Sequence, residues 1–252
     1  MKTVSFKGLL YREYYLIKEK LLSYIVMVVS FTLLPVLMVL SSKYGNIALI
    51  LNKSDIGDAL LPIIEVTKIL PAMSDVMFVS LALDMGIPDY NPLWESFRLS
   101  SPVKGMRFAA ARYTVTTICV IVSAVLGLAA TFLMAAVDGT AVTKADIVII
   151  FIMLAIFLLF TTAGQISTLI FRSQDKGMLA LLGIMMTGGI AISSFIINNS
   201  PVAERTPEEQ FDFIIEVKNK CAELLPLSLA VIIITLIAGF LATAALYRRR
   251  LK

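Results

Sequence analysis

Six long apolar segments dominate this sequence, and each is about long enough to cross a lipid bilayer. A transmembrane helix needs roughly 20 mostly apolar residues to span about 30 Å of hydrocarbon. Of the 252 residues, 58% are hydrophobic and only 16% are charged, and the mean hydropathy is +0.88, which is unusual for a soluble domain. We therefore predict an all-α integral membrane protein, one transmembrane domain over residues 1–252. Its six spans are expected at about 21–41, 60–83, 108–137, 147–171, 178–198 and 224–246.

The distribution of Lys and Arg predicts which side of the membrane each loop occupies. Cytoplasmic loops carry an excess of these residues. An even number of spans puts both termini on one side. If that side is the cytoplasm, 15 of the 22 Lys and Arg residues lie inside and 7 lie outside, so we expect cytoplasmic termini. The net charge of +4 then reflects topology and anionic lipid, and it does not indicate nucleic-acid binding.

Two amphipathic segments are predicted outside the spans. Residues 5–20 indicate an interfacial helix in the cytoplasmic headgroup region, with a simple cytosolic extension of the first span as the alternative. On the outer side, the capping signals of Thr206-Pro207 and Glu209 predict an amphipathic helix over 207–222. In the first segment, the apolar residues that can share one helical face are Phe6, Leu9, Leu10, Tyr14 and Ile17.

Several kinds of chemistry are missing from the sequence. It has no histidine, so His-based metal sites and His general bases are excluded. It has neither a GxxxxGK[ST] nor a GxSxG pattern, so we expect no P-loop and no serine hydrolase site. The two cysteines, Cys119 and Cys221, are expected mid-span and outside, which makes a disulfide between them improbable. We predict no catalytic residue, no metal and no cofactor in this chain.

The second predicted span carries three charged residues, Glu65, Lys68 and Asp75. At about 100° per residue they fall within roughly 80° of one another on a helix. Charges within the bilayer are costly and face protein or water. One interpretation is a polar stripe along a translocation path or a subunit seam. The other is that 60–68 lies in the outer interface and only Asp75 is immersed.

The loop over residues 85–107 is the largest on the predicted cytoplasmic side. Pro88 ends the preceding helix, a short helix is possible over 93–99, and Ser101 with Pro102 can begin the next one. This geometry fits a short crosswise helix that docks into a groove on a soluble partner. An ordinary loop with an interfacial tryptophan, Trp94, is the alternative.

The same loop contains a pattern found in one family. An acidic residue, a tryptophan before a short helix, a proline turn and a basic residue followed by tyrosine occur here in order. They are Asp84, Trp94, Leu99-Ser100-Ser101-Pro102-Val103-Lys104 and Arg112-Tyr113. With six spans and a basic amphipathic N-terminal helix, the chain resembles permease subunits of type-2 ATP-binding-cassette exporters. It is most similar to small, separately encoded permeases, such as those that export phenol-soluble modulins, and to bacteriocin export or immunity systems.

The resemblance implies an ATP-driven exporter in the bacterial plasma membrane, in which two permease copies, expected to be a homodimer, pair in the lipid. A separate P-loop ATPase subunit would bind ATP and magnesium and would drive peptide or other hydrophobic cargo outward. The residues implied in coupling to that ATPase are Pro88, Trp94, Glu95, Phe97, Arg98, Leu99, Pro102 and Lys104, with Arg172 and Lys176 from the next cytoplasmic loop.

Two other functions remain open at this point. An ion-coupled secondary transporter or channel would use Asp75 with Glu65 and Lys68 and would need no ATPase. A non-transporting scaffold or immunity protein would protect by sequestering a toxin. The presence of a P-loop ATPase in the adjacent reading frame would favour the exporter.

Overall fold

The structure, a computed structural model, describes residues 5–45, 70, 78–84, 105–171, 173, 175–183, 186, 220 and 222–250. Within these ranges the regular elements are all helical and no strand occurs, so the predicted helical class is confirmed for this part of the chain. The elements are α1 (Phe6–Tyr44), η1 (Phe78–Ser80), α5 (Leu81–Asp84), α7 (Gly105–Asp138), α8 (Lys144–Phe171), η4 (Ala222–Leu224) and α11 (Leu225–Arg250).

Four of the described helices are long and apolar enough to cross a membrane. They are α1, α7, α8 and the helical run of η4 with α11. The predicted spans 21–41, 108–137, 147–171 and 224–246 fall within these helices. The predicted spans 60–83 and 178–198 lie largely outside the described residues, and the predicted outer helix 207–222 lies almost wholly outside them.

Local capping explains where two of the long helices begin. The Ser5 side chain accepts a hydrogen bond of 3.2 Å from the Lys7 backbone N–H at the start of α1. Before α8, the Asp146 carboxylate accepts from the Thr143 backbone N–H at 2.9 Å, and Thr143 Oγ1 accepts from the Asp146 N–H at 3.3 Å. This reciprocal pair satisfies backbone donors that a helix start leaves unpaired.

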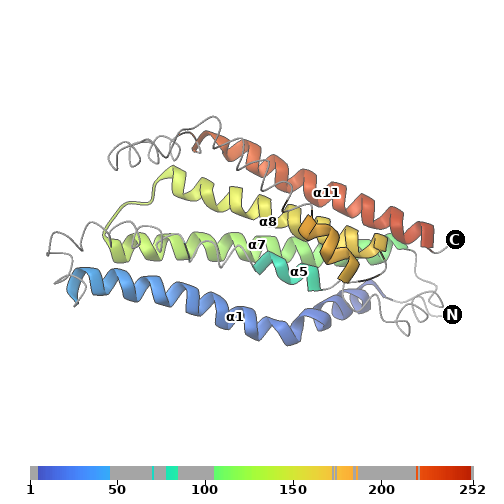
Figure 1. Cartoon of the computed structure of the whole chain (residues 1–252), viewed down its shortest axis with the longest axis horizontal. Helices are drawn as coiled ribbons and strands as arrows, with labels where there is room; N and C mark the ends of the chain where they lie inside the picture. Colours follow the sequence, from blue (N-terminus) through green and yellow to red (C-terminus); the bar gives the residue numbers. More distant parts are fainter. Residues whose placement is uncertain are drawn as a thin grey trace.

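Two of the long helices run in one direction and two in the other, and the start of α1 and the end of α11 lie on one side (Figure 1). Helices α1 and α7 begin there, and α8 and α11 end there; we call this the termini end and the opposite one the far end. A buried apolar cluster at the termini end joins all four helices through Leu9, Phe108, Leu169 and Tyr247. At the far end, Val39 of α1 packs with Met134 of α7.

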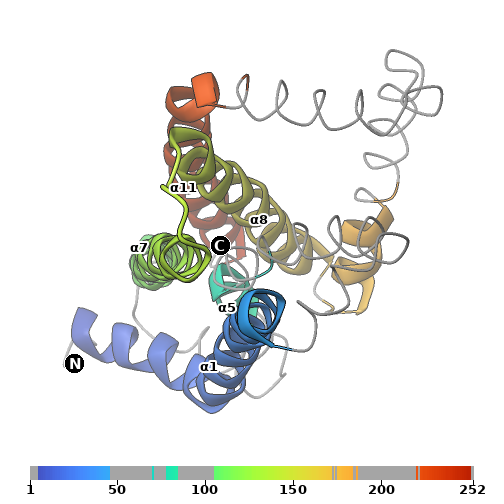
Figure 2. The ribbon, with the colours of Figure 1, turned by 90° about the vertical axis from the view of Figure 1, so that its left-hand side faces the viewer.

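Helix α1 is continuous but bent, so that its first part runs at an angle to the rest (Figures 1 and 2). We call residues 6–20 the N-terminal arm. The arm buries Leu9, Glu13 and Ile17, spaced four residues apart, against the bundle. The apolar face predicted from the sequence is therefore only partly right, because Phe6 and Tyr14 remain exposed.

The short elements η1 and α5 lie between α1, α7 and α8 (Figure 2). Phe78, Leu81 and Ala82 pack in one apolar cluster with Ile17 of the arm and Val115 of α7. The four-residue helix α5 is too short to be stable alone, so these contacts hold it in place.

Candidate functional site

The most unusual feature of the described residues is a buried ion pair at the termini end. Arg112 Nε of α7 lies 3.5 Å from Glu13 Oε2 of the arm, and both residues are 1% exposed. A guanidinium nitrogen of the neighbouring Arg12 contacts the other carboxylate oxygen of Glu13. A charge buried in a low-dielectric interior is stable only when it is paired and hydrogen-bonded. The pair therefore fixes the position of the arm against α7.

Two aromatic rings lie beside the cations of this pair, and one of them belongs to a third helix, α11. The Arg112 guanidinium lies 5.9 Å from the ring centroid of Tyr247 in α11, and Arg12 lies 5.9 Å from the ring of Phe108. The two rings are themselves 6.2 Å apart, in a tilted arrangement. A desolvated cation over an aromatic face is attracted to the ring quadrupole. We call Arg12, Glu13, Phe108, Arg112 and Tyr247 the terminal joint, because they connect α1, α7 and α11.

Gly105, the first residue of α7, packs directly against the backbone of α11. A Cβ atom at Gly105 would lie 2.7 Å from the Cβ of Tyr247 and 3.1 Å from its carbonyl carbon. Any larger residue would push α7 away from α11. Gly105 thus lets the start of α7 pack directly against α11 next to the terminal joint.

Tyr113, the neighbour of Arg112, binds a different part of the bundle. Thr243 Oγ1 of α11 donates to the Tyr113 hydroxyl at 3.5 Å, and the Phe240 ring meets the Tyr113 ring edge to face at 6.2 Å. A Cβ atom at Gly239 would collide with the same hydroxyl and would lie 2.6 Å from Cγ2 of Thr162 in α8. Small residues at such points allow membrane helices to approach closely. Arg112 and Tyr113 therefore tie the start of α7 to α1, α8 and α11 together.

The short helix α5, which comes before residues 85–104 in the chain, is also held by contacts with its neighbours. The Gln165 side chain of α8 donates a 2.6 Å hydrogen bond to the Ala82 carbonyl of α5. This carbonyl is one of the last four of a helix that ends at Asp84, where intrahelical donors run out. On the α1 side, the hydroxyls of Tyr24 and Ser80 are 2.9 Å apart, and the Tyr24 and Phe78 rings meet edge to face.

The far end carries a simpler contact between α1 and α7. Lys43 Nζ donates to the backbone carbonyls of Val137, at 3.0 Å, and of Asp138, and lies 3.8 Å from the Asp138 carboxylate. A cation at a helix C-terminus satisfies carbonyls and favours the helix dipole. Gly139 follows with a φ of 72°, a left-handed conformation that glycine adopts without strain.

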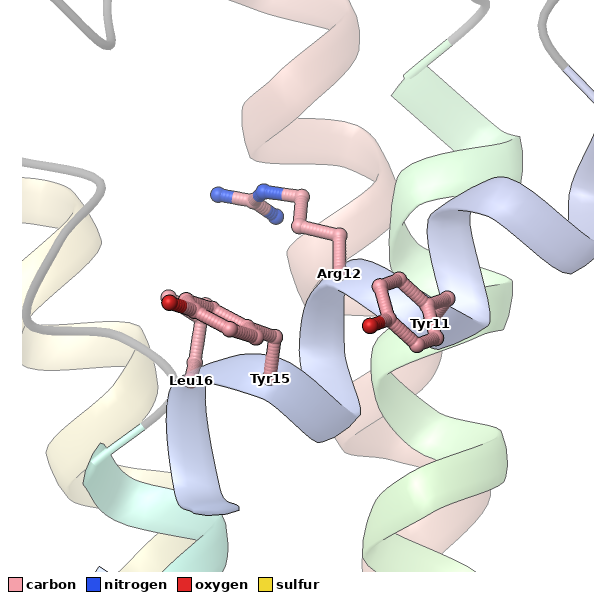
Figure 3. A pocket seen from close by; sticks show the side chains of 4 residues that line it. All are labelled: Tyr11, Arg12, Tyr15 and Leu16. Carbon is pink, nitrogen blue, oxygen red and sulfur yellow. The ribbon is translucent and has the colours of Figure 1, made fainter. Parts of the chain in front are cut away.

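An open hollow is lined by residues of the arm (Figure 3). Its lining consists of Tyr11, Arg12, Tyr15 and Leu16. In Figure 3, α7 and α11 lie behind the arm, and the Arg12 and Tyr15 side chains project to the same side. Among the described residues, no group of three His, Cys, Asp or Glu side chains is placed to hold a metal ion.

Most of the residues singled out from the sequence lie outside the described residues. This applies to every predicted coupling residue except Lys176, and to Glu65, Lys68 and Asp75. Lys176 is exposed and lies shortly after α8, which ends at the termini end. Its neighbour Gly177 approaches the Thr168 backbone, since a Cβ atom there would lie 2.7 Å from Thr168 Cα.

We did not predict a role for Glu13, Tyr247 or Gln165 from the sequence. A signal for Glu13 was present, because it lies four residues from both Leu9 and Ile17 on a face that is otherwise apolar. A carboxylate in the middle of a buried stripe demands a cationic partner. Nothing in the local sequence pairs it with Arg112, which is distant along the chain.

In comparisons with protein-family models, curated proteins and solved structures, nothing matches this chain.

Proposed function

We propose that this chain is the membrane-spanning permease subunit of an ATP-driven exporter, worked by a separate P-loop ATPase. The observation that carries the proposal is the attachment of the chain on both sides of residues 85–104. α5 ends at Asp84 and α7 begins at Gly105, and both flanking elements are tied into the bundle. Residues 85–104 contain most of the proposed docking residues, from Pro88 to Lys104.

A movement of this segment would be passed on in two directions. Through α5, it would reach α8 by the Gln165 hydrogen bond and α1 by the contact between Tyr24 and Ser80. Through the start of α7, it would reach the arm by Arg112 and α11 by Tyr113. Rigid helices joined by specific contacts are the kind of connection that carries a partner's motion into a bundle. This geometry supports the docking interpretation of the loop.

The distribution of charge supports cytoplasmic termini. The termini end is rich in cations, which the positive-inside rule associates with the cytoplasm, whereas cations and carboxylates balance at the far end. Described cations on the side of the termini end are Lys7, Arg12, Lys18, Lys20, Arg107, Arg112, Lys176, Arg248 and Arg249, and those of the far end are Lys43, Lys144 and Lys220.

Exposed apolar side chains support a location in lipid. Leu33 and Leu37 of α1 and Ile233 and Ile237 of α11 are each more than half exposed in the isolated chain. Such surfaces suit hydrocarbon or the apolar face of a second permease copy. We propose a homodimer in the bacterial plasma membrane. The cargo class, amphipathic peptides or other hydrophobic antimicrobial molecules, follows from the family resemblance.

Co-purification tests the proposal. The chain is co-expressed with a P-loop ATPase, the one from the adjacent reading frame if that frame encodes one, then solubilised and isolated by a tag on the permease. We expect the ATPase to be retained by the wild type and by the far-end control Lys144→Gln. Trp94→Asp and a deletion of residues 93–99 should lose the ATPase while the permease still elutes as a folded particle. An ATPase that stays bound to both variants would exclude this docking site.

A further inference from the structure

The outward face of the N-terminal arm has a composition different from that of its buried face. At about 100° per residue, five exposed residues fall within a stripe roughly 100° wide. This stripe lies opposite Glu13, the centre of the buried face. We call it the outward stripe; its members are Lys7, Tyr11, Tyr14, Tyr15 and Lys18.

The side chains of this stripe are open to the surroundings of the protein. Tyr11 is 67% exposed and Tyr15 is 53% exposed, and both line the hollow on the arm. The Lys18 ammonium lies 6.0 Å from the centre of the Tyr15 ring, so a cation and an aromatic surface are presented together.

The position of the arm relative to the hydrocarbon layer of the membrane follows from the residues that come after it. Exposed apolar side chains suited to hydrocarbon begin at Leu22 and continue through Ile25 and Val26. The outward stripe therefore lies just beyond the hydrocarbon boundary of α1. Tyrosine prefers this level of a membrane, and lysine there is attracted to anionic lipid headgroups.

We propose that the outward stripe, with the hollow lined by Tyr11, Arg12, Tyr15 and Leu16, is a binding site for an anionic phospholipid. The tyrosine rings and Leu16 contact the glycerol and upper acyl region, and Lys18, whose ammonium lies beside the Tyr15 ring, faces the phosphate. Lys7, about 16 Å away along the helix, attracts the anionic headgroup at longer range. The five residues of the stripe carry two positive charges and no carboxylate, and the carboxylate of Glu13 is directed to the opposite side, toward Arg112. The exposed Glu19 lies at the edge of the stripe. Of its residues, only Tyr14 belongs to the apolar face that the sequence predicts for the headgroup region. The site does not depend on the transport function proposed above.

Native mass spectrometry of the full chain in detergent tests this site. The protein is titrated with phosphatidylglycerol or with phosphatidylcholine, and the dissociation constant of the first bound lipid is measured. We expect the wild type to prefer phosphatidylglycerol. Lys7→Gln and Lys18→Gln should each weaken it about fivefold, and the double variant roughly 30-fold, which corresponds to about 2 kcal/mol. The far-end control Lys144→Gln should bind like the wild type.

Three results would overturn the site. The first is an unchanged affinity for phosphatidylglycerol in the double variant. The second is equal affinity of the wild type for both lipids. The third is full competition by soluble glycerol phosphate, which would make the ligand a free anion and not a membrane lipid. Both lysines are exposed, so circular dichroism of the lipid-free variants should match the wild type and show that the fold is intact.

Discussion

Arg112 of α7 and Glu13 of the N-terminal arm form a buried ion pair, with Nε and Oε2 separated by 3.5 Å. The residue after Arg112, Tyr113, contacts α11 through Thr243. Two consecutive residues thus attach the start of α7 to its neighbours on different sides. In the proposed exporter, this is the place where movement of the docking loop enters the bundle.

Removing one partner of the buried pair should be strongly destabilising. Glu13→Ala leaves Arg112 without its carboxylate, and we expect a loss of about 3 kcal/mol in the free energy of unfolding. Arg112→Ala should have a similar effect, and the double variant should lose less than the sum. Denaturant unfolding in mild detergent measures all three. Additive losses would show that the two side chains do not stabilise one another.

The contact at the far end should matter much less. Lys43 and Asp138 keep side-chain exposures of 32% and 18%, and solvent screens such pairs. We expect Lys43→Met to lower the free energy of unfolding by less than about 1 kcal/mol, mostly through the lost helix cap. A loss as large as that of Glu13→Ala, measured in the same detergent, would contradict this ranking.

Gly239 should not tolerate a side chain. Alanine at this position collides with the Tyr113 hydroxyl and crowds Thr162, so we expect Gly239→Ala to cost about 1–3 kcal/mol. Gly183→Ala is a matched control, because a Cβ atom there meets nothing within 4 Å. It should be neutral or slightly stabilising, since alanine favours the helix. Thermal unfolding of both variants gives the comparison, and equal losses would contradict the close contact at Gly239.

The hydrogen bond from Gln165 should protect α5. Gln165→Leu removes the donor to the Ala82 carbonyl, and we expect a loss of about 1 kcal/mol. Hydrogen–deuterium exchange over residues 78–84 should become faster in this variant while exchange in α11 stays unchanged. If protection of residues 78–84 is the same in variant and wild type, other contacts hold α5.

The long helices were predictable because apolar length is a strong local signal. Segments such as 147–171 contain nothing but membrane-compatible residues over the required distance, and α8 extends over Lys144–Phe171. The capping pair before α8, Thr143 with Asp146, was not predicted, although its spacing fits a helix start. Four of the six predicted spans coincide with described helices for these reasons.

The site at the termini end was much harder to predict. The pairing of Glu13 with Arg112 depends on how α1 bends and on which face it turns inward, and neither is encoded within a few residues. The same holds for Tyr247 and Gly105, which meet only after α7 and α11 have packed. Arg112 and Tyr113 were singled out by resemblance alone, and their separate partners emerge from the tertiary structure.

Transport into inverted membrane vesicles tests the central claim most directly. A fluorescent amphipathic peptide is added outside vesicles that contain the chain and its partner ATPase. Its uptake into the vesicles is followed with and without ATP. We expect uptake that requires ATP hydrolysis, persists when ion gradients are dissipated and disappears with Trp94→Asp. Uptake driven by an ion gradient in vesicles without the ATPase would contradict it.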